Sequence, residues 1–317
     1  MRVLVTGGTG YLGSAIVRAL ERAGHEAVVF ARRASAAGRP GRSIDGDVRD
    51  TRAVAKAADG VDAICHTAAL VAVWQSNRAD FDAVNVGGLQ SALAAARTHH
   101  IPRLVYTSSF LALPPAGSPQ ALTANDYQRT KVAARDVARR AAADGVPIVI
   151  LYPGVVYGPG PVTEGNLVGR LIDDHRRGRL PGVVGMERLW SFSFAEDVAD
   201  AHVLALTHPS PAREYVVGGV NAPQQTIFEF MREREGRPLP RRLPYSIATV
   251  GAMLIEAFAA VSRRPPLVTR GVVEIFRHDW PLDSGAAVRE LGLRMTPLAE
   301  GLARTLESLI APAPGLR

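Results

Sequence analysis

A tyrosine and a lysine stand four positions apart in the segment Tyr127-Gln128-Arg129-Thr130-Lys131. On a helix, residues i and i+4 lie on one face, so the phenol and the ammonium would point into the same space. Lysine is rare in this chain, where Lys56 and Lys131 are the only two. An ammonium beside a phenol stabilises the phenolate and lowers the tyrosine pKa, whereas the planar guanidinium of arginine suits bidentate anion binding. The pair predicts acid–base chemistry in which both side chains contact a substrate and a cofactor.

The N-terminus has the pattern of a loop that holds such a cofactor. An apolar run at residues 1–5 leads into Thr6-Gly7-Gly8-Thr9-Gly10-Tyr11-Leu12-Gly13 and then into a helical pattern at residues 15–20. Glycines there permit a positive φ and a close approach to a pyrophosphate, which the N–H groups of the new helix hold. Because the loop follows a strand and opens a helix, it predicts a dinucleotide site; a glycine turn without a ligand is the competing interpretation. The residues of this site would be Gly7, Thr9, Gly10, Tyr11 and Leu12.

These segments resemble the extended short-chain dehydrogenase/reductase family, which holds nucleotide-sugar epimerases, dihydroflavonol reductases and 3β-hydroxysteroid dehydrogenases. The resemblance covers most of the chain and favours the dihydroflavonol 4-reductase-like and 3β-hydroxysteroid dehydrogenase-like branch. Besides the glycine loop and the Tyr-Lys pair, it rests on Asp47-Val48, His66-Thr67-Ala68-Ala69, Asn85-Val86-Gly87-Gly88, Tyr106-Thr107-Ser108-Ser109, and residues 152–159 and 194–199. The C-terminal half, which would carry the substrate, resembles the family only loosely.

The resemblance implies catalytic roles. Tyr127 would be the general acid when a carbonyl is reduced, or the base when an alcohol is oxidised. Lys131 would tune Tyr127 and hydrogen-bond the nicotinamide ribose. Ser109 would donate a hydrogen bond to the substrate oxygen, with Ser108 as the alternative donor.

The resemblance also implies further cofactor contacts. Asp47 and Val48 would flank the adenine, although an aspartate in such a loop is equally explained as a helix N-cap. A second set would contact the rest of the dinucleotide and consists of Thr67, Ala68, Ala69, Ser108, Tyr127 and Lys131. Pro153, Gly154, Val155 and Val156 would line the nicotinamide, with a simple strand-to-loop break as the alternative interpretation.

The end of the second strand bears on the choice of cofactor. Rossmann folds that prefer NAD place an acid there to hold the ribose 2′-OH, while an arginine accommodates a 2′-phosphate. This chain has Phe30-Ala31-Arg32-Arg33 and no acid. Arg32 and Arg33 therefore favour NADP(H), NAD(H) stays possible, and loop charges on a basic protein are the alternative explanation.

The first half alternates short apolar runs with alanine-rich helical stretches, which predicts an α/β fold with a doubly wound parallel sheet, the Rossmann fold. A smaller, mostly α-helical C-terminal region would bind the substrate. We expect the Rossmann domain at residues 1–155, with 190–220 returning to it, the substrate-binding region at 156–189 and 221–311, and a frayed tail at 312–317. The strand candidates are Val28-Val29-Phe30, Ala63-Ile64-Cys65, Arg103-Leu104-Val105-Tyr106, Ile148-Val149-Ile150-Leu151 and Tyr215-Val216-Val217.

Charge and composition fit an enzyme. The net charge is +7, but 30 acidic residues are interleaved with the basic ones and no nucleic-acid-binding module is recognisable, so nucleic acid is not an expected partner. The single cysteine, Cys65, lies in an apolar run and predicts a buried thiol. His66 is interpreted as strand-end packing and the pair His99-His100 diverges, so we expect no metal site. No signal-type segment opens the chain, and the cytoplasm is the expected location.

The apolar segment at residues 247–261 is too short to span a bilayer, which needs about 20 apolar residues, and Glu256 interrupts it. A helix that covers the substrate cleft is the favoured interpretation. The alternative is an interfacial helix on a membrane, with Arg263 and Arg264 meeting headgroups.

The substrate is expected to be apolar. Only about 17 residues separate Ser109 from Tyr127, which predicts a short loop and an open cleft. Phe110 and Leu111 follow Ser109 without the polar residue that related epimerases keep there, and a sugar would need hydrogen-bonding partners. Aromatic residues that could line the substrate site, or pack in the core, are Trp74, Phe110, Trp190 and Phe194.

The favoured function is therefore an NADP(H)-dependent reductase of a ketone or aldehyde that acts on a small-molecule substrate. An NAD-dependent nucleotide-sugar epimerase or dehydratase is the second hypothesis, and a non-catalytic NADP-binding sensor is the third. The resemblance also implies a possible homodimer, formed through the helix that bears the Tyr-Lys pair and the helix before it.

Overall fold

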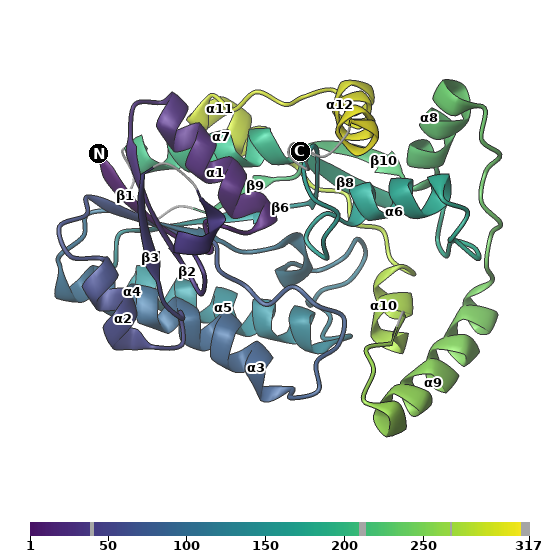
Figure 1. The fold of residues 1–317 in the computed structure, drawn as a ribbon, viewed down its shortest axis with the longest axis horizontal. Coiled ribbons are helices and arrows are strands. Elements are labelled where there is room, and N and C mark those ends of the chain that lie inside the picture. The colour runs from purple at the N-terminus through teal and green to yellow at the C-terminus, as the bar shows by residue number, and fades with distance from the viewer. Residues whose placement is uncertain (39–40, 209–213, 267, 312–317) are drawn as a thin grey trace.

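The computed structural model describes all residues except 39–40, 209–213, 267 and 312–317, so the predicted frayed tail lies outside the described residues (Figure 1). Seven parallel strands form the main sheet in the order β3-β2-β1-β4-β5-β6-β9. The order reverses between β1 and β4, and dinucleotides bind at the carboxyl ends of strands at such a switch point. The predicted doubly wound sheet is confirmed. The strands are β1 (Arg2–Thr6), β2 (Glu26–Ala31), β3 (Arg42–Asp45), β4 (Ala63–His66), β5 (Leu104–Thr107), β6 (Ile148–Pro153) and β9 (Glu214–Val217).

Helices cover both faces of this sheet, which is why its central strands are apolar without alternation (Figure 1). On one face lie α1 (Tyr11–Arg22), α7 (Ala195–Thr207) and α11 (Gly285–Leu291); on the other lie α2 (Thr51–Ala57), α4 (Gly88–Thr98) and α5 (Asp126–Ala143). Cys65 of β4 is buried between β1 and β5, and burial raises the pKa of its thiol to about 12. The predicted core thiol is confirmed.

The edge strand β3 was not among the sequence candidates. Its residues Arg42-Ser43-Ile44-Asp45 are mostly polar because only β2 pairs with it and its other edge faces outward. Asp45 accepts hydrogen bonds from the backbone N and the hydroxyl of Ser35, 2.9 and 2.6 Å away. These bonds tie the turn after β2 to the end of β3.

The second region combines helices with a three-stranded sheet in the order β10-β8-β7 that the sequence did not reveal. Residues 190–220 were expected to return to the Rossmann domain. In this stretch α7 packs on the main sheet and β9 pairs with β6, whereas β8 pairs with β7 and β10. The chain turns out of the main sheet at Gly154, where a Cβ would lie 2.4 Å from the carbonyl oxygen of Ser191 in β8. The remaining elements are β7 (Val155–Tyr157), β8 (Leu189–Phe194), β10 (Val220–Pro223), α6 (Leu167–Arg176), α8 (Gln225–Glu235), α9 (Tyr245–Ser262), α10 (Arg270–Ile275) and α12 (Leu298–Ile310).

Candidate active site

The glycine loop joins β1 to α1 at the switch point of the sheet. Gly7 has a φ of +73° and a Cβ there would lie 2.8 Å from the backbone of Ala68, while a Cβ on Gly13 would lie 2.2 Å from the carbonyl oxygen of Gly7. Only glycine fits either position. Gly10 caps α1 without a side-chain hydrogen bond, and no acidic residue stands in the first turn. The first N–H groups of α1 are therefore available to an anion.

Tyr127 and Lys131 lie on α5, as their spacing predicts. The Lys131 side chain is 3% exposed, and its Nζ donates a hydrogen bond to the carbonyl oxygen of Thr107 at 3.1 Å. Its Nζ lies 5.9 Å from the ring centre of Tyr127 and 5.5 Å from that of Tyr106. The structure thus brings the phenol and the ammonium together beside the end of β5.

Burial dominates the protonation of both groups. It raises the pKa of Tyr127 to about 12, against a lowering contribution from a hydrogen bond with Ser109, and it lowers the pKa of Lys131 to about 8. The expectation that Lys131 lowers the Tyr127 pKa therefore does not describe the protein without cofactor, because the loss of hydration disfavours the phenolate more than the nearby groups stabilise it. At neutral pH, Tyr127 is a protonated phenol and Lys131 an ammonium.

The two serines at the end of β5 differ in their partners. Ser109 is buried, its Oγ accepts a hydrogen bond from Leu111 N at 3.2 Å, and its hydroxyl interacts with Tyr127. The Ser108 hydroxyl is also buried, and it interacts with the phenol of Tyr106 instead of Tyr127. Ser109 is the serine placed beside the phenol.

Asn85 is a buried asparagine that contacts α5, and no role for it was expected from the sequence. Asn85 belongs to a π-helical segment, Asp82–Gly87, which precedes α4. Its Nδ2 donates to Thr130 Oγ1 at 2.9 Å, and its Oδ1 accepts from Leu70 N at 2.7 Å. The amide thus connects the loop after β4 to the helix that carries Tyr127. A buried amide in a mostly apolar segment is the signal that could have identified it.

The residues predicted to contact the adenine end of the cofactor lie at the ends of β2 and β3. Arg32 and Arg33 are exposed directly after β2, and neither takes part in an ion pair within the part of the chain that the structure describes. Asp47 holds the guanidinium of Arg49, with 2.7 Å between Oδ2 and Nη2, and Val48 is a core residue. Asp47 is not an N-cap: that role belongs to Asp50, whose side chain accepts from Arg52 N and Ala53 N at the start of α2.

The other predicted cofactor contacts come from two chain segments. Thr67, Ala68 and Ala69 follow β4, and Thr67 Oγ1 donates to the carbonyl oxygen of Thr6 at 2.7 Å. Across the switch point, Gly154 N donates to Ser193 Oγ at 2.8 Å, which fixes the bend between β6 and β7. Around that bend stand the residues predicted to line the nicotinamide, Pro153, Gly154, Val155 and Val156.

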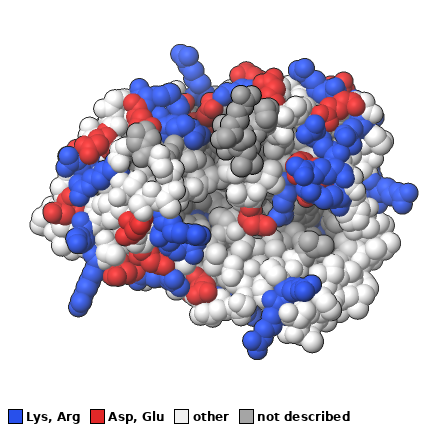
Figure 2. Space-filling model, in the orientation of Figure 1, with Lys and Arg blue, Asp and Glu red and all other residues white. Residues whose placement is uncertain are grey.

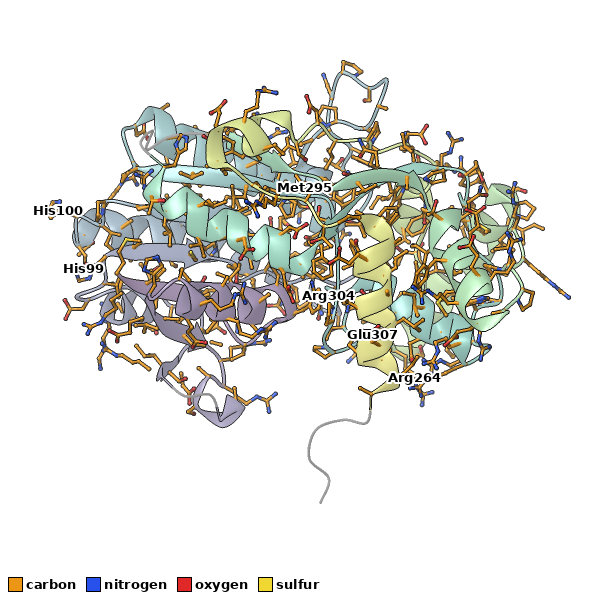
Figure 3. The ribbon with its side chains drawn as sticks, turned by 90° about the horizontal axis from the view of Figure 1, so that it is seen from above. His99, His100, Arg264, Met295, Arg304 and Glu307 are labelled. Atoms are coloured by element: carbon orange, nitrogen blue, oxygen red, sulfur yellow. The ribbon has the colours of Figure 1, made fainter. Side chains whose placement is uncertain are left out.

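The histidines differ in their surroundings. His66 at the end of β4 is 1% exposed, its Nδ1 lies 2.9 Å from Thr6 Oγ1, and burial with the nearby Lys131 charge lowers its pKa to about 3. It is a neutral packing residue, as predicted. His99 and His100 lie at the outer end of the molecule, far from the site (Figure 3). The described residues contain no group of three His, Cys, Asp or Glu that could hold a metal ion.

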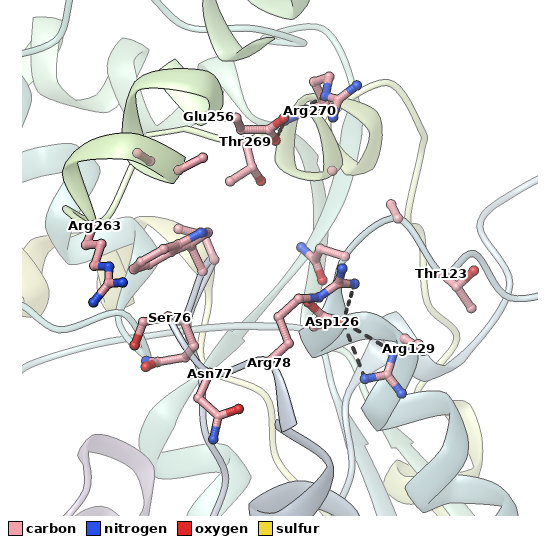
Figure 4. Close-up of a pocket in the computed structure, with 18 residues that line it drawn as sticks. Ser76, Asn77, Arg78, Thr123, Asp126, Arg129, Glu256, Arg263, Thr269 and Arg270 are labelled. Carbon is pink, nitrogen blue, oxygen red and sulfur yellow. Dashed lines mark hydrogen bonds and ion pairs between the residues drawn. The ribbon is translucent and has the colours of Figure 1, made fainter. Parts of the chain in front are cut away.

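A cavity of about 870 Å³ opens beside the first turn of α5 (Figure 4). Three segments form its walls: residues 73–78, the start of α5, and α9 with the start of α10. Asp126 holds Arg78 and Arg129, at 2.8 and 3.3 Å, whereas Glu256 holds Arg270 at 2.6 Å. The sequence did not reveal this network, because its members come from separate segments that carry no recognisable motif.

The four aromatic candidates separate into two groups. Trp74 lines the cavity. Phe110, Trp190 and Phe194 are buried in the core of the second region, where Phe110 also packs against Trp280 with 5.3 Å between ring centres. For these three, core packing is the correct interpretation.

The residues present fit a dinucleotide. An uncapped helix N-terminus follows a loop in which two glycines leave no room for a Cβ, and an exposed arginine pair stands after β2. The buried hydroxyl of Ser108 stands directly after β5. These are the donors that a phosphate, a ribose and a nicotinamide require.

Comparison with known proteins agrees with this geometry. A family model described as "NAD dependent epimerase/dehydratase family" matches residues 3–218. The chain is 32% identical to sterol demethylase protein B of Methylococcus capsulatus, covering 92% of this chain and 93% of that protein. It is also 32% identical to a 2-alkyl-3-oxoalkanoate reductase of Stenotrophomonas maltophilia, covering 81% and 78%.

Among solved structures, the fold resembles a UDP-glucose 4-epimerase of Thermus thermophilus in complex with NAD, with a TM-score of 0.75, 24% identity, and coverage of 97% and 98%. At this low identity the structural match supports the fold alone. The family assignment rests on the family model and on the two relatives that are 32% identical. The predicted resemblance is confirmed: the chain belongs to the NAD dependent epimerase/dehydratase family and is an oxidoreductase of the extended short-chain dehydrogenase/reductase type.

Proposed function

We propose that this protein is an NADPH-dependent reductase of an apolar or aromatic ketone or aldehyde, which oxidises the corresponding secondary or primary alcohol in the reverse direction. The observation that carries the proposal is the grouping of Ser109, Tyr127 and Lys131 at the carboxyl end of β5, on the same edge of the sheet as the glycine loop after β1. We assign the substrate to the region formed by residues 156–189 and 221–311, together with the cavity beside α5.

When bound along the glycine loop and beside Lys131, a nicotinamide would supply the hydride for the carbonyl carbon. Tyr127 donates its phenolic proton to the carbonyl oxygen, and its pKa of about 12 keeps this proton in place at neutral pH. Ser109 donates a hydrogen bond to the same oxygen, which stabilises the negative charge that develops there. Lys131, held by the carbonyl oxygen of Thr107, orients the nicotinamide ribose and stabilises the tyrosinate left after proton transfer.

The apolar substrate class is supported by the residues around Ser109. Phe110 and Leu111 are packed in an apolar cluster and offer no side-chain hydrogen-bond partner to a sugar hydroxyl. The names of two relatives, a sterol demethylase protein and a 2-alkyl-3-oxoalkanoate reductase, also refer to largely apolar compounds.

The preference for NADPH is supported by the turn after β2. Arg32 and Arg33 stand where an acid would hold an unphosphorylated ribose, and both are exposed. An NAD-dependent nucleotide-sugar epimerase is the second candidate, because the fold matches an epimerase that binds NAD. In that reaction the hydride returns to the substrate within one turnover.

A carbonyl panel tests the proposal. Purified protein is incubated with NADPH and with sterol ketones, 3-oxoalkanoates, aromatic ketones and UDP-glucose, and NADPH consumption is followed at 340 nm. The proposal expects consumption with at least one apolar carbonyl compound and its loss in Tyr127→Phe. Conversion of UDP-glucose to UDP-galactose in a parallel reaction with NAD⁺, together with no NADPH consumption by any carbonyl compound, would contradict it and identify the epimerase.

A further inference from the structure

Helix α9 carries a continuous apolar surface that the other described residues of the chain do not cover. Its residues are spaced by three and four positions, so they form one face of the helix. We call this face the α9 stripe; its members are Ile247, Val250, Met253, Leu254, Phe258 and Val261, each half exposed or more and Val261 86% exposed. The buried residues of α9 are small: Ala248, Ala252 and Ala259. An exposed apolar surface of this size marks an interaction site.

The charged residues that directly flank α9 in the chain are all arginines. Glu256 is the only charged residue within α9; it lies outside the stripe and is paired with Arg270. Exposed arginines stand at both ends: Arg241 and Arg242 before the helix, Arg263 and Arg264 after it. None of these four forms an ion pair with a carboxylate in the described part of the chain. In Figure 2 the surface at the place of α9 is white, with basic side chains at its lower end.

We propose that the α9 stripe inserts into the interfacial layer of a bilayer that contains anionic phospholipid, while the flanking arginines contact lipid phosphates. Among the described residues, α9 is the one helix apolar and long enough to be considered for crossing a membrane. Its 18 residues extend only about 27 Å, less than a hydrocarbon core of about 30 Å. Its other face packs on α10 and is tied to Arg270, so the helix lies along the membrane surface.

The charges favour a lipid surface over a second copy of the chain. A two-fold axis would pair the α9 helices either parallel or antiparallel. In both cases arginines at one end of the stripe would face arginines of the other copy, with Arg263 and Arg264 against themselves or against Arg241 and Arg242. Anionic headgroups neutralise the same side chains.

With α9 on a membrane, the substrate could come from the bilayer. This inference rests on the proposed function. A different face of α9 lines the cavity beside α5 through Ala259, Ala260 and Arg263 (Figure 4). Helix α9 therefore separates the cavity from the proposed membrane. An apolar carbonyl compound dissolved in the bilayer would reach the cavity along this helix without passing through bulk water.

Vesicle flotation tests the docking surface without using the reaction. The full-length protein is mixed with vesicles of phosphatidylcholine alone or with phosphatidylglycerol, and the bound fraction is measured. We expect binding to the anionic vesicles, and a loss of affinity of about tenfold or more in Leu254→Glu/Phe258→Glu. Val288→Glu is the matched control, because Val288 is 43% exposed on α11, away from the stripe, and this variant should bind like the unmodified protein.

A second variant tests the charges. Arg263→Gln/Arg264→Gln should weaken binding to anionic vesicles several-fold and reduce its dependence on salt. Absent binding of the unmodified protein, or equal binding of the stripe variant, would overturn the proposal. So would a change from dimer to monomer in the stripe variant, measured by light scattering, because a second copy would then cover the stripe. NADPH affinity, measured separately, shows whether a failure concerns the membrane or the reductase.

Discussion

At the scale of single residues, burial and hydrogen bonding act in opposite directions on Tyr127. Burial raises the pKa of its phenol to about 12, while Ser109 favours the phenolate. With so high a pKa, the Tyr127 phenol stays protonated and neutral across the physiological pH range. In the proposed reaction, proton transfer leaves a tyrosinate that must be stabilised. Lys131 is the nearby cation that we propose stabilises it.

Replacing Tyr127 by Phe removes the proton donor and leaves the ring. We expect kcat to fall by about a hundredfold to ten-thousandfold, as for the loss of a general acid, with NADPH affinity changed little. Steady-state kinetics and a binding titration measure the two effects. Tyr152→Phe is the control, because Tyr152 bonds Glu214 at 3.0 Å outside the site. A Tyr127→Phe enzyme with full kcat would exclude the assigned role.

The Lys131 ammonium predicts the pH dependence. Its pKa is about 8, so the protonated form declines as the pH rises through 8, while Tyr127 keeps its proton. The rate of carbonyl reduction should therefore be constant below pH 8 and fall about tenfold per pH unit above it. A pH–rate profile from 6 to 10 measures this, and a flat profile to pH 10 would contradict the role of the ammonium.

The same lysine should affect stability in the opposite direction. Its pKa in the folded protein lies below the unfolded value of about 10.4, so the unfolded chain binds more protons between these values. The contribution of Lys131 to the free energy of unfolding therefore increases as the pH rises from about 8 to about 10. Urea unfolding of Lys131→Met beside the unmodified protein isolates this contribution, which the variant should lack.

Ser109 and Ser108 form a natural matched pair. Ser109→Ala should lower kcat by roughly ten- to a hundredfold, because it removes a hydrogen bond to the developing oxyanion. Ser108→Ala should change kcat much less, since its hydroxyl does not interact with the Tyr127 phenol in this structure. A larger fall of kcat in Ser108→Ala than in Ser109→Ala would instead assign the hydrogen-bond donor role to Ser108.

At the scale of elements, the sequence predicted those strands and helices whose pattern is local. The central strands are continuous apolar runs because both of their faces are covered, and the glycine loop has a fixed spacing. The short polar strand β3 escaped prediction because an edge strand needs no apolar run. The β10-β8-β7 sheet escaped because it is assembled from segments far apart in the chain.

The turn between β1 and α1 predicts the effect of one methyl group. In Gly13→Ala the new Cβ would lie 2.2 Å from the carbonyl oxygen of Gly7, so helix and loop must separate. We expect NADPH binding to weaken by at least about tenfold and the protein to lose roughly 1–3 kcal/mol of stability. Gly87→Ala is the control, since its Cβ would meet only Asp82 O at 3.8 Å. Unchanged NADPH affinity in Gly13→Ala would contradict the assigned loop.

At the scale of the whole molecule, the proposed chemistry and the cavity use different residues. Ser109, Tyr127 and Lys131 stand at the end of β5 and on α5, whereas the cavity is lined by residues 73–78, by residues around the start of α5, and by α9 and the start of α10 from the second region. The sequence could predict the first part from the motifs around Gly7, Ser109 and Tyr127. It could not predict the cavity, because the ion pairs of Asp126 and Glu256 join segments that lie far apart or carry no recognisable motif.

Binding of a dinucleotide across the switch point should stabilise the whole fold. NADPH at a hundred times its dissociation constant should add about 2.7 kcal/mol to the free energy of unfolding, because it binds only the folded state. Thermal unfolding at increasing NADPH concentrations measures this as a rising Tm. Gly13→Ala should show a much smaller rise at the same concentrations.

The most direct test of the central claim is the nucleotide affinity of the protein itself. Denatured protein is first analysed for released nucleotide, and the nucleotide-free form is then titrated with NADPH and with NADH. The account predicts no tightly retained nucleotide and NADPH bound at least tenfold more tightly than NADH, about 1.4 kcal/mol, with that difference lost in Arg32→Ala/Arg33→Ala. Stoichiometric retained NAD, or tighter binding of NADH, would contradict the account and favour the nucleotide-sugar epimerase.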